Sequence, residues 1–180
     1  GSTKEVNLGT TYGTHTLRIA NTSTPSECST EGFSQTACGF VLEFANIITT
    51  HKTNDTLTNI GGWPATSMRT FVNNDIYNAI PNEIKNAIID TFVVSGHGPD
   101  DTENFMSIDK LYLLNSPEVL AEAYGSDISE HDKAENKTRQ LDYYNNLGVT
   151  TENPSAAVKK YGTDVYNWWL RTVHPQSSSS

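Results

Sequence analysis

Two adjacent tryptophans near the end of the chain, in the block Trp168-Trp169-Leu170-Arg171, constrain the fold more than any other feature. So much apolar surface in four residues needs other side chains to pack against. After this block come only Thr172 to Gln176 and four serines, which offer almost nothing to bury. We therefore expect one domain over residues 3–174 that lacks its C-terminal strands, and a tail or linker over residues 175–180.

The size and charge of the chain exclude some classes of protein. At 180 residues it is long enough for one domain with a proper core. Its 21 acidic and 12 basic residues give a net charge of −9, which is the wrong sign for binding nucleic acid. The sequence contains no apolar run long enough to cross a bilayer. We expect neither a nucleic-acid partner nor membrane insertion of this segment.

The two cysteines, Cys28 and Cys38, lie ten positions apart in a polar stretch. An even count in such a chain favours one local disulfide, and two free thiols are the alternative. A bridge over so short a loop stabilises a fold by roughly 2–3 kcal/mol. With no second cysteine pair and five scattered histidines, the sequence does not predict a zinc site.

The first residues of the chain leave the cellular location of the protein open. No secretory signal is present, but Gly1-Ser2 is typical of a cloning remnant, so the missing leader does not indicate the cytoplasm.

The first part of the chain predicts strands. Residues Glu5–Leu8 and Thr14–Ala20 alternate with period two around a turn at Gly9–Gly13, which indicates a hairpin. The run Gly39–Ile48 is dense in apolar residues. Such density predicts a central strand that is partly buried on both faces.

The middle of the chain predicts helices. Apolar residues recur every three or four positions from Met68 to Ile80, so this helix has one apolar face. Pro64 suits its start and Pro81 breaks it. Asn82 is then a candidate cap for a second helix.

Later segments return to mixed structure. The patterns predict strands at Thr91–Val94, Lys110–Leu114 and Tyr166–Val173, and helices that begin at Ser116, precede Gly148, and run from Pro154 to Gly162. Strands first, helices in the middle and a final strand indicate an α+β fold whose two ends meet in one antiparallel sheet.

The loop from Ser95 to Ser107 is the strongest candidate for chemistry. His97 lies between glycines and close to Asp100 and Asp101. Oxygen-rich loops suit Ca²⁺, but the spacing fits no EF-hand and histidine is a poor calcium ligand. A structural turn, a weak Ca²⁺ site at the two aspartates and a catalytic loop remain open, and we expect no cofactor.

Other catalytic patterns are absent from the sequence. No Gly-x-Ser-x-Gly elbow supports a serine triad, and no lysine follows Gly61-Gly62 at phosphate-loop spacing. We therefore expect a protein that is not an enzyme, although a hydrolase built on His97 stays as an alternative.

The tryptophans allow two interpretations. Aromatic side chains stack on sugar rings and anchor protein interfaces, but they also fill cores. Neighbours on a strand point to opposite faces. We expect one of Trp168 and Trp169 to lie in the core and the other to face elsewhere, and Trp63 to pack at the start of its helix.

Five blocks in the same order carry a resemblance to a known family: Gly61-Gly62-Trp63-Pro64, Met68 to Asn74, Asp109 to Leu114, Thr138 to Tyr144, and Trp168 to Arg171. From about Val6 to Arg171 the chain resembles an uncharacterised domain of gut-bacterial secreted and surface proteins, which is similar to C-type-lectin-like domains. The resemblance implies an α+β fold with an antiparallel sheet and helices inserted mid-chain. It also implies an extracellular or cell-surface location. In that family a hairpin and a closing strand come after the Trp-Trp-Leu-Arg strand, and this chain lacks both.

The resemblance also implies where a ligand binds. C-type-lectin-like folds often bind near the final hairpin, which indicates Trp169, Arg171 and His174, with His97 as a further candidate. No calcium motif of true lectins is visible. We expect a non-enzymatic, adhesin-like module that recognises a glycan or a protein, next to other domains of a larger protein. The alternatives are the hydrolase with His97, Asp100 and Asp101, and a structural spacer.

Overall fold

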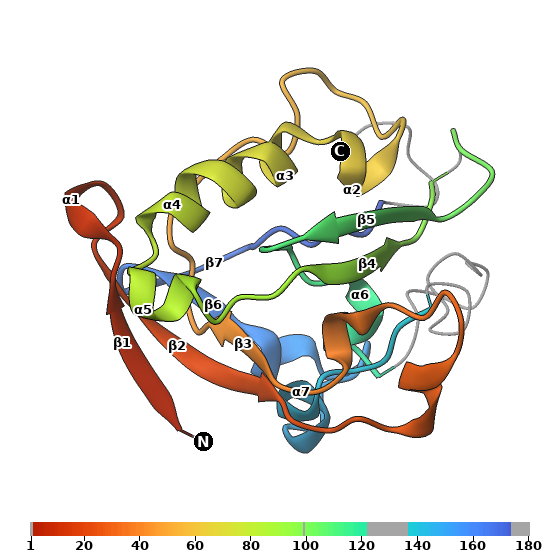
Figure 1. Ribbon diagram of the computed structural model, residues 1–180, viewed down its shortest axis with the longest axis horizontal. Coiled ribbons are helices and arrows are strands. Elements are labelled where there is room, and N and C mark those ends of the chain that lie inside the picture. The colour runs from red at the N-terminus through yellow and green to blue at the C-terminus, as the bar shows by residue number, and fades with distance from the viewer. Residues whose placement is uncertain (1, 99, 122–136, 174–180) are drawn as a thin grey trace.

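A computed structural model of the chain describes residues 2–98, 100–121 and 137–173. The fold mixes small antiparallel sheets with short helices (Figure 1). In chain order its elements are β1 (Thr3–Asn7), α1 (Gly9–Tyr12), β2 (Thr14–Asn21), η1 (Ser26–Ser29), η2 (Gln35–Ala37), β3 (Val41–Phe44), α2 (Gly62–Ala65), α3 (Ser67–Phe71), η3 (Val72–Ile76), α4 (Tyr77–Ala79), α5 (Asn82–Lys85), β4 (Thr91–Ser95), β5 (Phe105–Asp109), α6 (Ser116–Val119), α7 (Asp142–Asn146), η5 (Pro154–Ala157), β6 (Lys159–Tyr161) and β7 (Asp164–Tyr166).

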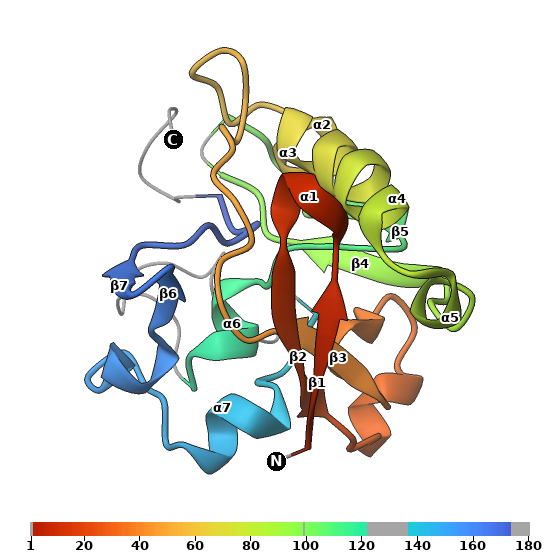
Figure 2. The ribbon, with the colours of Figure 1, turned by 90° about the vertical axis from the view of Figure 1, so that its left-hand side faces the viewer.

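The first sheet has the order β1-β2-β3, and both of its pairings are antiparallel. The predicted hairpin of β1 and β2 is confirmed, and the short helix α1 joins the two strands (Figure 2). Gly13 ends α1 at a φ of 77°, a conformation that suits glycine. Val6 and Leu17 point into a small core that also contains Ile80.

The predicted central strand over Gly39–Ile48 is wrong in length and position. Only β3 is a strand there, and it lies at the edge of the sheet with β2 in the centre. Gly39 turns the chain before β3 with a φ of 75°, and the Asn46 side chain accepts a hydrogen bond from Lys160 N beyond it. These two features limit the strand, and Phe40 and Leu42 stay exposed.

The helix predicted from Met68 to Ile80 is confirmed as the consecutive elements α3, η3 and α4, where η3 is a π-helical stretch. Met68, Ile76 and Ile80 form its buried face. Pro64 does not start this helix, because it lies in the separate turn α2. The cap is Thr66, whose side chain accepts a hydrogen bond from the Arg69 N–H.

Of the two predictions for the residues that follow this helix, one is confirmed and one is wrong. The helix ends before Pro81, as predicted, and α5 follows directly. Asn82 is the first residue inside α5 rather than its cap, and no side-chain capping bond starts this helix. The cap position is Pro81, with a φ of −56° and a ψ of 143°, and its side chain has no acceptor for a capping hydrogen bond.

The second sheet pairs β4 with β5. The predicted strand at Thr91–Val94 is confirmed as β4, whereas the strand predicted at Lys110–Leu114 is wrong, because β5, the strand that pairs with β4, ends at Asp109. The reason is Asn73, whose side chain accepts hydrogen bonds from Lys110 N and Leu111 N and donates one to Leu111 O. This side chain takes the backbone groups that a strand partner would use.

The last part of the chain differs most from the predictions. Asn115 caps α6 in a capping box with Glu118, and α7 ends near Gly148, as expected. Gly162, however, forms the turn of the β6–β7 hairpin and does not close a helix. Residues 167–173 are not a strand, and in the described residues the two chain ends share no sheet.

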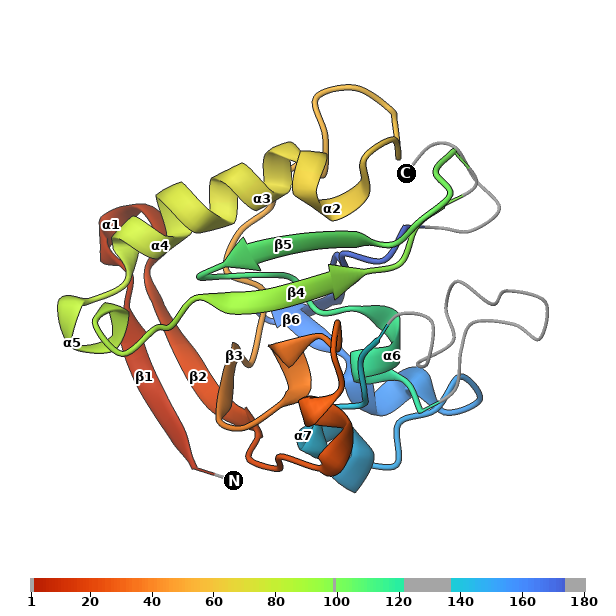
Figure 3. The same cartoon turned by 45° about the vertical axis from the view of Figure 1, so that its right-hand side comes forward.

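In the part of the chain that the structure describes, the elements form layers around three apolar clusters. In Figures 1 and 3 the helical run α3–η3–α4 lies along one side of the β4–β5 pair, and the first sheet lies on the other side. The largest cluster joins Ala37, Val41 and Tyr144 with Trp168 at its border. In the described residues no helix is long and apolar enough to span a membrane.

Candidate functional site

A large apolar cleft opens between the first sheet, the helical run and the β4–β5 pair. Its volume is about 790 Å³, within the range of pockets that hold small ligands. Residues 40–44, the segment 110–114 and the segment 166–169 line it. Because most of these side chains are aliphatic or aromatic, the cleft is the candidate binding site.

Large apolar side chains on the cleft wall are exposed to solvent. Phe40 is 68% exposed, Ile89 is 74% exposed and Trp169 is 48% exposed. Single exposed apolar residues are common, but a group of them around one concavity marks an interaction site.

A group of charged side chains, the Arg18–Glu43–Lys159 cluster, lies at one side of the cleft. Glu43 accepts from Arg18 Nε at 2.8 Å and from Lys159 Nζ at 2.9 Å. Lys159 Nζ also donates to Phe44 O at 2.7 Å, and Tyr144 OH donates to Glu43 at 2.9 Å. Two cations share one carboxylate, so the cluster carries one surplus positive charge.

Burial and pairing shift the pKa values in this cluster. Burial lowers the pKa of the Lys159 amine, and the neighbouring Glu43 opposes only part of that shift. Burial would lower the pKa of Arg18 as well, but the attraction of Glu43 outweighs it and raises this pKa. Burial, followed by the charge of Glu43, raises the pKa of Tyr144.

Aromatic rings cover both cations. The Arg18 guanidinium lies 3.8 Å from the centroid of the Tyr143 ring, and Lys159 Nζ lies 5.0 Å from that of Trp168. These are cation–π distances. Lys159 is therefore held in place at the wall of the cleft, and Arg18 is held behind Glu43.

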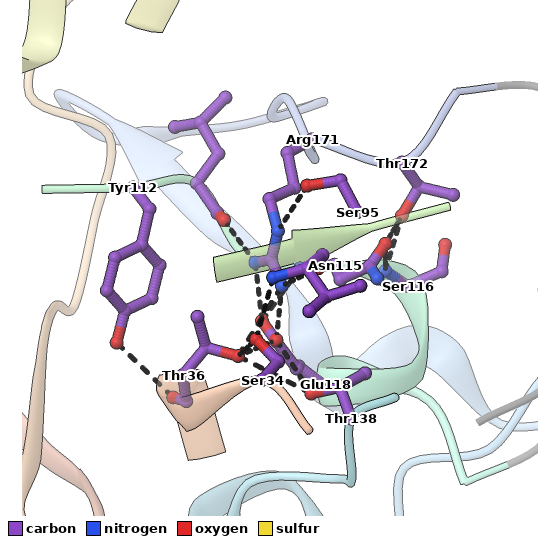
Figure 4. A network of polar contacts seen from close by, with 12 residues as sticks. Ser34, Thr36, Ser95, Tyr112, Asn115, Ser116, Glu118, Thr138, Arg171 and Thr172 are labelled. Atoms are coloured by element: carbon purple, nitrogen blue, oxygen red, sulfur yellow. Dashed lines mark hydrogen bonds and ion pairs between the residues drawn. The ribbon is translucent and has the colours of Figure 1, made fainter. Parts of the chain in front are cut away.

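A second polar network, centred on Arg171 and Glu118, lies inside the molecule (Figure 4). Both side chains are fully buried and meet at 2.5 Å. Arg171 also donates to Leu113 O at 2.6 Å and to Ser95 Oγ at 3.1 Å. Figure 4 shows Thr36 and Ser34 converging on the same carboxylate region from the segment before β3.

This network fixes the tryptophan block. Arg171 N donates to Leu114 O at 2.9 Å, so the segment runs beside residues 113–115 without forming a strand. Trp168 is half-buried and donates from Nε1 to Ala157 O at 3.0 Å. Trp169 faces the cleft and solvent. The expected division between the two tryptophans is thus observed.

The structure places the predicted site residues in different environments. His97 bonds through Nδ1 to Gly98 O, and its N–H donates to Asn104. Asp101 accepts from Gly61 N at 3.1 Å, which ties two loops together. Among the described residues, the hydrogen bonds of His97 go to Gly98 and Asn104 and not to Asp100 or Asp101, and no group of three metal-ligating side chains occurs.

Two other predicted residues do not lie on a described surface. Arg171 has no exposed side-chain area, because Glu118 and backbone carbonyls surround it. His174 lies outside the described residues. Of the predicted ligand residues, Trp169 is therefore the one that the structure places at the cleft.

Sequence reasoning missed the Arg18–Glu43–Lys159 cluster. A signal was present, because Arg18 and Glu43 are single charges inside apolar strand patterns. A charge at such a position implies a buried partner. Lys159 carries no such signal, because the pattern from Pro154 to Gly162 predicts a helix rather than the strand β6.

The predicted disulfide between Cys28 and Cys38 is present. It joins η1 to the residue after η2, close to the strand β3 that lines the cleft.

The family model described as Domain of unknown function (DUF6273) matches residues 40–180. No curated protein and no solved structure matches the chain. The match covers well over half of the sequence and includes β3, the helical run and the pair of Arg171 and Glu118, and the chain therefore belongs to the DUF6273 family.

Proposed function

We propose that this domain is a non-enzymatic ligand-binding module of a bacterial surface or secreted protein, with the apolar cleft as its binding site. One observation carries the proposal: the cleft of about 790 Å³ is lined by β3 and bordered by exposed apolar side chains. Large exposed apolar surfaces around a concavity mark binding sites in folded domains.

The lining favours a protein ligand over a glycan. Glycan sites combine stacking rings with many hydrogen-bonding side chains, whereas Leu42, Ile89 and Ile108 are aliphatic and line the cleft. Trp169 and Tyr166 can stack on sugars, but they can equally anchor a protein interface. We therefore place a protein ligand first and a glycan second.

The C-type-lectin-like fold is part of this proposal. It rests on the resemblance of the five blocks, whose residues make buried polar contacts that hold irregular segments together. Trp63 Nε1 donates to Asp109 at 2.9 Å, Asn73 binds Leu111, and Arg171 pairs with Glu118. Such contacts specify a fold, which is consistent with blocks that belong to a scaffold.

The test presents the chain to two ligand collections. A displayed library of random 12-residue peptides and a glycan array are screened with the wild type and with the variant Ile89→Asp. Since Ile89 is 74% exposed and lines the cleft, the charge leaves the core intact and opposes apolar binding. We expect wild-type binders to lose roughly tenfold or more in affinity for this variant.

The matched control is Leu57→Asp. Leu57 is 81% exposed and lies away from the cleft, so the control adds the same charge without touching the site. Binding that survives in both variants contradicts the cleft as the site. No binder in either collection contradicts the proposed function itself.

A further inference from the structure

We infer that the cleft binds an extended, apolar peptide segment of another polypeptide, which carries an acidic side chain and adds as a strand to the open edge of β3. This inference rests on the proposed function and names the class of ligand and its mode of binding.

The edge of β3 is open on the side that faces the cleft. In the described residues β3 pairs only with β2, while every residue from Phe40 to Phe44 lines the cleft. Consecutive residues of a strand point to opposite faces, so a cleft that touches all of them runs along the strand edge. An unpaired edge is a template for a further strand.

The register shows which backbone groups are available. Ala45 N donates to Thr16 O, and in an antiparallel pair the hydrogen-bonded residues alternate. Glu43 therefore bonds to β2, while Leu42 and Phe44 direct their N–H and C=O groups away from it. Phe44 agrees with this pattern, since its carbonyl accepts from Lys159 Nζ on the open side. Leu42 is left as the centre of the open edge.

The neighbouring hairpin limits the length of the site. Just beyond β3, Ile47 N donates to Lys160 O, so β6 already occupies the continuation of this edge. The part that β6 leaves uncovered spans residues 40–44, roughly 13 Å at the rise of a strand, and at its end Phe44 O already accepts from Lys159 Nζ. A peptide of five or six residues matches this length.

Charge complementarity selects the peptide. The chain as a whole is acidic, with a net charge of −9, yet the Arg18–Glu43–Lys159 cluster has one surplus positive charge beside Phe44. Glu43 and Lys159 line the cleft, and Arg18 lies behind Glu43, to which it is paired. A carboxylate on the peptide at this end would balance the cluster, and apolar residues would fill the rest of the cleft.

The experiment uses synthetic copies of the peptides recovered from the 12-residue displayed library. Each is titrated into the wild type, into Leu42→Pro and into Leu42→Val. Proline removes the Leu42 N–H on the open edge without removing a hydrogen bond to β2. Valine keeps this N–H and, like leucine, has an aliphatic side chain. Circular dichroism confirms that both variants fold.

We expect Leu42→Pro to weaken binding by roughly tenfold or more, and Leu42→Val to change it by less than about threefold. N-methylation of every second peptide residue should weaken binding when the methylated N–H groups face β3, and should not weaken it when they face away from β3. Exchange of the peptide's Asp or Glu for Asn or Gln should weaken binding by roughly tenfold.

Other results overturn the inference. Peptides that bind Leu42→Pro as tightly as the wild type would exclude strand addition while leaving the binding function intact. If the screens find glycan binders but no peptide binders, the ligand is a glycan and not a peptide. If the wild type forms a concentration-dependent dimer and Leu42→Pro abolishes it, the partner of the β3 edge is a second copy of this chain and not another polypeptide. No binder of either kind would remove the proposed function as well.

Discussion

At the scale of residues, Arg171 and Glu118 form an ion pair with no exposed side-chain area. The sequence shows Arg171 as part of a conspicuous block, but the resemblance implies that it lies on a ligand surface. Its partner is 53 positions away in the sequence, and no local pattern reports a contact at that separation. The guanidinium instead joins α6, β4 and the segment before β3.

The first prediction concerns this pair. Glu118→Gln leaves the Arg171 charge buried without its partner, so we expect the free energy of unfolding to fall by about 3–5 kcal/mol. Urea unfolding, monitored by tryptophan fluorescence, measures this change. The control is Glu83→Gln, which removes the exposed ion pair with Lys4 and should cost less than about 1 kcal/mol. Equal losses in the two variants would contradict the role given to the network.

The second prediction concerns Asp142 and acid. Burial raises the pKa of this carboxyl, but hydrogen bonds from Thr22, Ser23 and Arg139 outweigh it and hold the pKa well below its usual value. A depressed pKa in the folded state stabilises the fold at pH values above the unfolded pKa of about 3.9. That contribution is lost as the pH falls through the lower, folded pKa.

We therefore expect Asp142→Asn to be less stable than the wild type by on the order of 1–2 kcal/mol at pH 7. The difference should shrink as the pH falls from about 5 toward 2. Thermal unfolding at a series of pH values measures it. A difference that stays constant over this range would show that the charge of Asp142 does not stabilise the fold.

At the scale of elements, the segments with clear periodicity could be predicted from the sequence. The β1–β2 hairpin, the apolar helix face from Met68 to Ile80, and β4 are confirmed, because alternation and helical spacing are local properties. The strand predicted at Lys110–Leu114 is wrong because the Asn73 side chain, almost forty positions away, bonds to its backbone. Propensity cannot report such a contact.

The third prediction tests the role of Asn73 in holding residues 110–114. Asn73→Ala leaves the N–H groups of Lys110 and Leu111 without their acceptor, so we expect a loss of about 2–3 kcal/mol in the free energy of unfolding. Asn74→Ala is the control, because Asn74 is exposed and its side chain donates to Thr70 O within the same helical run. It should cost less than about 0.5 kcal/mol. Equal effects of the two variants would contradict this role.

At the scale of the whole molecule, the cleft joins elements that are far apart in the sequence. Strand β3, the segment 110–114 and the segment 166–169 line it together. The sequence predicts Trp169 for the site, but not β3, because the run Gly39–Ile48 has the composition of a central strand. A strand at the edge of a sheet and one at its centre can have the same composition, and only the tertiary pairing distinguishes them.

The most direct test of ligand binding in the cleft is amide hydrogen exchange on the whole chain, alone and with a saturating peptide from the displayed library. We predict slower exchange at Leu42 and across residues 110–114, with no change in β1, which lies on the far edge of the first sheet. Slower exchange confined to residues outside the cleft, or no change anywhere, would contradict binding in the cleft.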